Sequence, residues 1–263
     1  MHTEALFSYA TLLGFLFTLA RVSGVFAFLP LAAFRATPDT VKVVLSLAFT
    51  VLLWPEWKSP VAPGAVGDES IGRIVAGLGG ELALGLAIGL TVTIVLELFQ
   101  VSAQIVSLQA GFGFASTIDP TSGADSTVLI SLAQLTAGLL FFTAGGDRML
   151  VKVLADSMRL CPPESFTMKS GWADAIIRFS STIFSAGLRL AAPVIALLLL
   201  ADVSLAVLGR MQQQLHLVSL TMPLKLVAAV LLLSVTVTFQ PAFFDSMMAS
   251  GVRLMEAILR SAH

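Results

Sequence analysis

The sequence predicts an all-α, multi-helix protein associated with a membrane. Hydrophobic residues make up 57% of its 263 residues, charged residues only 12%, and the mean hydropathy is +0.93. Soluble domains carry about 45–50% apolar and about 25% charged residues, so a water-soluble chain of this size could not bury the excess. The formal net charge of −1 offers no basic field for nucleic acid. Three scattered histidines and a single cysteine predict no metal site, and no cofactor is expected.

Prolines and glycines divide the first half of the chain into separate helices. The apolar helical runs of this half are expected at about Ala5–Phe34, Val43–Pro55 and Ile71–Ala110. The segment Arg35–Lys42 breaks the first run, because Pro38 lacks the amide hydrogen that a helix needs. Glu56–Asp68 holds two prolines and two glycines, which predict a loop of turns before the long third run.

The second half is divided in the same way and ends in a helical hairpin. Its helical runs are expected at about Thr127–Ala144, Met149–Leu160, Trp172–Gly209 and Leu224–Leu259. The sequence GGDR separates the first two runs, and CPPES ends the amphipathic second run. The polar link RMQQQLHLVSLTMP joins the last two runs. The whole chain is therefore expected to contain about six main helical segments.

Charged residues interrupt most of the apolar runs. They lie at Arg21, Glu81, Glu97, Arg189, Asp202, Arg210 and Lys225. One charge at the bilayer centre costs at least about 2.5–3.5 kcal/mol, so several unpaired charges facing lipid are untenable. They are expected to pair inside a bundle, to line a hydrated passage, or to lie outside the hydrocarbon layer. The candidates for pairing between helices or subunits are Arg21, Glu81, Arg210 and Lys225.

Small residues in the long third run predict close helix packing. Gly85 and Gly89 form a Gly-xxx-Gly pair, which lets two helix backbones approach where lipid gives no hydrophobic driving force. Glu81 precedes them by four and eight residues and shares their helical face. A carboxylate on this face needs a partner, which either Arg21 or Lys225 could supply. Packing within the chain and packing against another subunit both remain open.

An aromatic, glycine-rich stretch, QAGFGFASTIDPTSGADS, follows the long third run. A glycine precedes each of two phenylalanines and frees the backbone there, and the Asp-Pro pair behind them predicts a turn. The rings could be interfacial anchors or core fillers. Alternatively they could obstruct a passage, because apolar rings in a narrow pore exclude water and ions.

Four motifs together resemble a known family. They are ARVSGVFAFLP at Ala20–Pro30, ELALGLAIGL at Glu81–Leu90, SLQAGFGFASTIDP at Ser107–Pro120 and MPLK at Met222–Lys225. In this order and spacing they resemble the FliR family of flagellar biosynthetic proteins, together with its injectisome counterparts in type III secretion. The resemblance covers almost the whole chain.

The resemblance implies a subunit of the type III protein export gate, with no enzymatic activity. It implies a FliP-like front at residues 1–170 and a FliQ-like helical hairpin at residues 171–263. A channel plug would lie at about residues 109–123, with the plug residues Gly111, Phe112, Gly113, Phe114, Asp119 and Pro120. The partners would be FliP-like and FliQ-like subunits, an FlhB-like switch subunit and export substrates in transit. The implied location is the flagellar basal body in the bacterial inner membrane.

Three alternative functions remain open at this point. A virulence injectisome would use the same kind of export-gate subunit as a flagellum. A secondary transporter would also show interrupted helices and buried charges, but should show internal inverted symmetry. A membrane enzyme would need a clustered acid/base or metal constellation, which the spacing of the titratable residues does not favour.

Overall fold

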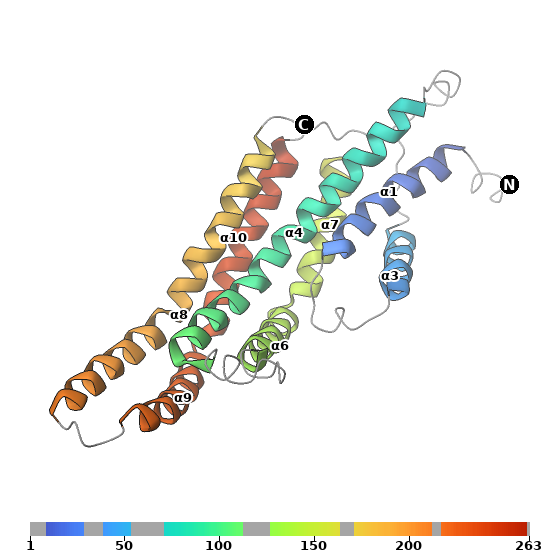
Figure 1. The fold of residues 1–263 in the computed structure, drawn as a ribbon. Coiled ribbons are helices and arrows are strands. Elements are labelled where there is room, and N and C mark those ends of the chain that lie inside the picture. The colour runs from blue at the N-terminus through green and yellow to red at the C-terminus, as the bar shows by residue number, and fades with distance from the viewer. Residues whose placement is uncertain are drawn as a thin grey trace. The chain divides into compact units, whose positions relative to one another are not determined.

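The computed structural model describes residues 9–28, 39–53, 71–112, 127–163, 171–211 and 217–261. All regular secondary structure within these ranges is helical, which confirms the predicted all-α class. The described helices are α1 (Tyr9–Phe28), α3 (Asp39–Leu52), α4 (Ile71–Ala110), α6 (Thr127–Thr143), α7 (Gly146–Leu160), α8 (Trp172–Met211), α9 (Leu217–Thr236) and α10 (Gln240–Ser261) (Figure 1).

Several helices have the length and composition of membrane spans. Three of the described helices, α1, α4 and α8, are long and apolar enough to cross a membrane, and the number rises to five if two bent pairs each count as one span. The two longest, α4 and α8, have 40 residues each. At about 1.5 Å per residue such a helix is about 60 Å long, twice the hydrocarbon thickness of about 30 Å. The chain therefore has the make-up of a multi-pass membrane protein.

A glycine stands at the break between α6 and α7. Gly145 lies between them with φ 72°, in the left-handed region that side chains other than glycine rarely adopt. The break that the sequence GGDR predicts is therefore present.

The bend between α9 and α10 corrects the sequence prediction, which treated Leu224–Leu259 as one run and expected about six main segments. The chain turns at residues 237–239, and the two helices meet at 62°. Pro241 stands in the first turn of α10, where its missing amide hydrogen is tolerated. It also disfavours helical geometry at Gln240, and the β-branched stretch before it has weak helix propensity.

The chain divides into two compact units. One consists of Met1–Ile94, Gly145–Ser180 and Met248–His263, and the other of Val95–Ala144 and Ser181–Met247. This division is based on contacts in space, and each unit is made of stretches that alternate along the sequence. The predicted boundary at residues 170 and 171 concerned likeness to two different subunits, and it stays a prediction.

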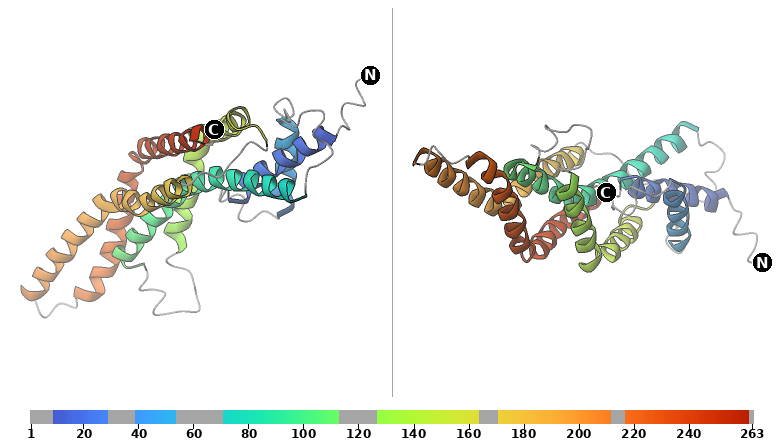
Figure 2. Two further views of the ribbon diagram at one scale, coloured as in Figure 1. Left: turned by 90° about the horizontal axis from the view of Figure 1, so that it is seen from above. Right: turned by 60° about the horizontal axis from the view of Figure 1, so that its bottom comes forward.

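In the first unit, α1 lies alongside the N-terminal half of α4 (Figures 1 and 2). Glycines allow this approach, because a Cβ atom added at Gly24 would lie 2.7 Å from the Leu82 carbonyl oxygen. The Thr93 hydroxyl of α4 donates a hydrogen bond to the Phe28 carbonyl oxygen at the end of α1. The two helices are thus in backbone contact over several turns.

In the second unit, the C-terminal half of α4 shares a core with α8 and α9. The buried members of this α4–α8–α9 cluster are Val106, Ala110, Ala191, Val194, Leu198 and Ala229. Phe244 of α10 is fully buried in the same unit, with its ring centroid 5.9 Å from that of Phe99. The burial and tight packing of these side chains hold the C-terminal end of α4 in place.

Candidate functional site

Two polar clusters lie inside the apolar helices, and the first surrounds Arg21 of α1. The Arg21 and Glu81 side chains are both fully buried, and Arg21 Nε lies 2.5 Å from Glu81 Oε2. The structure thus brings together two of the four predicted pairing charges. It selects Arg21, rather than Lys225, as the partner of Glu81.

The rest of the Arg21 guanidinium binds the C-terminal end of α7. Nη1 donates to the Ser157 carbonyl oxygen at 2.8 Å and to the Ser157 hydroxyl at 3.2 Å. Nη2 donates to the Cys161 carbonyl oxygen at 2.9 Å. The last carbonyls of a helix lack partners within the helix and carry partial negative charge. One buried cation therefore links α1, α4 and α7. It donates to the Cys161 carbonyl oxygen, and it is a second donor to the Ser157 carbonyl oxygen, which also accepts from the Cys161 amide.

The predicted packing glycines lie on the same interface of α1 and α4. A Cβ atom at Gly85 would collide with the Arg21 carbonyl oxygen, and one at Gly89 would lie 2.5 Å from the Val25 carbonyl oxygen. Both glycines therefore face α1 of the same chain. Between the two alternatives left by the sequence, the structure places these two positions in an intrachain contact.

The second polar cluster lies where α4 ends. The Asp202 carboxylate of α8 forms an ion pair with Lys225 of α9 through Oδ1. Its other oxygen, Oδ2, accepts a hydrogen bond of 3.1 Å from Gln109 Nε2 in the last turn of α4. Lys225 was predicted to pair, Asp202 was among the charges that interrupt apolar runs, and Gln109 began the predicted plug stretch, but the contacts among these three residues were not predicted. The presence of Asp202 inside an apolar run was a signal for them.

Just after this cluster, the chain leaves α4 through Gly111. Its φ of 85° lies in the left-handed region, and its amide donates to the Leu108 carbonyl oxygen at 3.3 Å. A glycine at this position is the usual way to end a helix. Phe112 follows half-buried, with its ring packed against the α4–α8–α9 cluster.

Of the five remaining predicted site residues, the structure describes only Arg210. Gly113, Phe114, Asp119 and Pro120 lie outside the described residues. Arg210 is exposed near the end of α8, and it forms no ion pair with any residue that the structure describes. Its predicted role in pairing stays a prediction.

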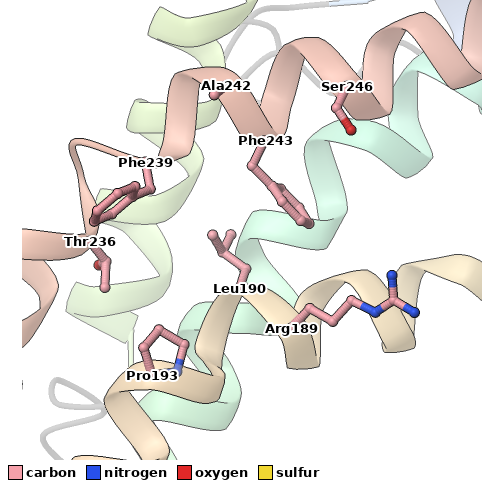
Figure 3. Close-up of a pocket in the computed structure, with 8 residues that line it drawn as sticks. All are labelled: Arg189, Leu190, Pro193, Thr236, Phe239, Ala242, Phe243 and Ser246. Carbon is pink, nitrogen blue, oxygen red and sulfur yellow. The ribbon is translucent and has the colours of Figure 1, made fainter.

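The second unit also contains a pocket of about 410 Å³ beside the bend between α9 and α10 (Figure 3). The rings of Phe239, Phe243 and Pro193 are part of its apolar lining. Arg189 is the only ionisable side chain among its described lining residues. In the described part of the chain, no three His, Cys, Asp or Glu residues are grouped so as to hold a metal ion. The described lining of this pocket therefore contains no acid/base pair.

The buried Cys161 gives a probe of the Arg21 cluster. Its side chain is 1% exposed, and Sγ lies 3.6 Å from the Leu259 carbonyl oxygen of α10. We expect a maleimide to label this thiol slowly in the folded chain and completely after unfolding in dodecyl sulfate. It is the single cysteine of the sequence, so labelling reports this site alone. Rapid labelling of the folded chain would contradict the burial.

Taken together, these features define a class. The chain is an all-α, multi-pass membrane protein in which fully and partly buried charges join helices to one another. Its described residues carry no metal-ligand cluster.

The sequence family is now clear as well. The chain belongs to the bacterial export proteins, family 1, whose family model matches residues 12–251. It is 27% identical over 241 residues to the flagellar biosynthetic protein FliR of Escherichia coli (strain K12), covering 92% of this chain and 90% of that protein. It is 26% identical over 229 residues to the surface presentation of antigens protein SpaR of Salmonella typhimurium, covering 87% and 84% respectively. The predicted resemblance to the FliR family of type III export proteins is confirmed.

Proposed function

We propose that the chain is a non-enzymatic subunit of a bacterial type III export gate, in which the segment that starts at Gly111 seals the channel. The observation that carries the proposal is the position of Phe112. Its aromatic ring follows a left-handed glycine at the end of a 40-residue helix, and it packs half-buried against the α4–α8–α9 cluster. Such a ring is held by packing alone, so it can block a narrow passage and still be displaced.

In this proposal the chain itself supplies no energy for export through the channel. Sealing requires apolar rings that exclude water and ions, and it requires no bond to be formed or broken. In the proposal, Phe114 on the far side of Gly113 supplies a second ring, and Asp119 and Pro120 form the turn behind it. Other components of the apparatus supply the energy.

The partners in this proposal are FliP-like and FliQ-like subunits and an FlhB-like switch subunit, with export substrates in transit. Exposed apolar side chains on α8 and α9 support an assembly in which other helices cover this chain, among them Leu199, Leu200, Val203, Val207, Leu231 and Val235. Large exposed apolar surfaces mark contacts with lipid or other chains. We place the assembly in the inner membrane, within a basal body. Relatives named FliR and SpaR support a flagellar and an injectisome setting respectively.

Removing both rings is the direct test. We expect Phe112→Ala with Phe114→Ala to raise the leak of small ions through the assembled complex in lipid vesicles. If each ring contributes about 1.5–3 kcal/mol to the closed arrangement, the leak should rise about tenfold or more. The matched control is Phe184→Ala on α8, where the ring is 69% exposed. An unchanged leak in a fully assembled double variant would contradict the sealing role.

A further inference from the structure

The carboxylate of Asp202 is the meeting point of three helices in the second unit. Oδ1 pairs with Lys225 Nζ of α9, and Oδ2 accepts from Gln109 Nε2 of α4. The Lys225 side chain is 14% exposed and that of Asp202 33% exposed, so solvent screens this cluster only in part. A hydrogen bond to an ionised acceptor is about twice as strong as a neutral one.

This cluster lies directly before the residues proposed to seal the channel. Gln109 precedes Gly111 by two residues and Phe112 by three. Between them, Ala110 is fully buried in the α4–α8–α9 cluster, against which the Phe112 ring also packs. The polar contact of Gln109 and the burial of Ala110 and Phe112 therefore all hold the end of α4 in the core that it shares with α8 and α9.

We propose that Asp202, itself held by Lys225, is a positioning residue that anchors the end of α4 through Gln109 and so fixes the place of Phe112. The inference rests on the proposed sealing role of Phe112, and adds what keeps the ring in the closed position. The Lys225 ammonium holds one carboxylate oxygen, which leaves the other directed at α4. A movement between α8 and α9 that breaks this ion pair would also loosen Gln109.

Reversing the polarity of the contact tests the anchor. In Gln109→Glu, a second carboxylate faces Asp202, and attraction becomes repulsion. Loss of a hydrogen bond to a charged group changes the equilibrium constant between the anchored and the released end of α4 about tenfold. We therefore expect the ion leak of the assembled complex in vesicles to rise about tenfold. The matched control is Gln104→Glu, which adds the same charge at an exposed position of the same helix.

A compensating change makes the test specific to the pair. In the double variant Gln109→Glu with Asp202→Asn, the new amide donates to the new carboxylate, so donor and acceptor are exchanged. Lys225 still finds a carboxylate within the cluster. We expect this double variant to return the leak to near the wild-type value. A general loss of folding would not be rescued in this way, because the second substitution removes a native charge.

The outcomes separate this inference from the proposed function. If the variant lacking both rings leaks and Gln109→Glu does not, the anchor is wrong and the seal stands. If Gln109→Glu leaks but Asp202→Asn fails to rescue it, the direct pairing is also wrong. If the variant lacking both rings does not leak, the sealing role of the rings and the anchoring role of Asp202 are both contradicted. Native gel mobility of each complex confirms that assembly is intact before the leak is compared.

Discussion

Replacing Arg21 by methionine is expected to lower the free energy of unfolding by about 3–5 kcal/mol, as removal of one partner of a buried ion pair does. The Glu81 carboxylate would stay fully buried without its cation. The Cys161 carbonyl oxygen at the end of α7 would also lose its Arg21 donor, and the Ser157 carbonyl oxygen would keep only the Cys161 amide. The measurements are thermal unfolding of the purified complex and the rate of maleimide labelling at Cys161, which should rise.

Two further variants show whether the ion pair itself causes this loss. Arg21→Met with Glu81→Met removes both charges, and it should be less destabilised than Arg21→Met alone because no buried charge remains. Arg260→Met breaks an exposed pair, in which Arg260 Nη2 lies 3.8 Å from Glu256 Oε2. Exposed pairs of this kind contribute about 0.3–0.5 kcal/mol. Equal effects of Arg21→Met and Arg260→Met would refute the assigned role of Arg21.

Arg21 suits this position for a geometric reason. The guanidinium is a planar fork of five donors, and its four hydrogen bonds to described residues use all three of its nitrogens. Lysine would present one ammonium group and could not reach the carboxylate and both carbonyls at once. The pair also fixes the register of α1 on α4, because Glu81 lies one turn before Gly85 on the face that contacts α1.

The sequence predicts the helices well where composition alone decides their ends. The expected run Ile71–Ala110 has the bounds of α4, because prolines and glycines precede it and Gly111 ends it. The expected run Leu224–Leu259 contains the bend between α9 and α10 instead. Hydropathy stays high across that bend, and the local signals for it were Pro241 and the β-branched stretch before it.

The candidate site was harder to predict, because its contacts join distant parts of the chain. Helical periodicity places Glu81 on the face of the packing glycines, but it cannot choose between two cations as the partner. Arg21 and Glu81 lie 60 residues apart, and Gln109 and Asp202 lie 93 apart. Half of the Arg21 contacts end on backbone carbonyls, which no side-chain pattern reveals.

A methyl group at Gly85 is expected to separate α1 from α4. In Gly85→Ala the added Cβ would collide with the Arg21 carbonyl oxygen and lie 3.1 Å from the Gly24 Cα atom. Both neighbours are backbone atoms, so no side-chain rotation can relieve the contact. Overpacking typically costs about 1–3 kcal/mol, and we expect the upper end of that range. Moving α1 outward would also lengthen the contact between Arg21 and Glu81.

Gly79 offers a matched control on the same helix. A Cβ atom at Gly79 meets no atom within 4 Å, and the residue is exposed. Because alanine favours a helix over glycine by about 1 kcal/mol, Gly79→Ala should raise the free energy of unfolding, whereas Gly85→Ala should lower it. Thermal unfolding of the two variants decides the matter, since the same change of residue must give opposite signs. If both variants unfold at higher temperature than the wild type, α1 and α4 do not approach each other at Gly85 as closely as the structure has them.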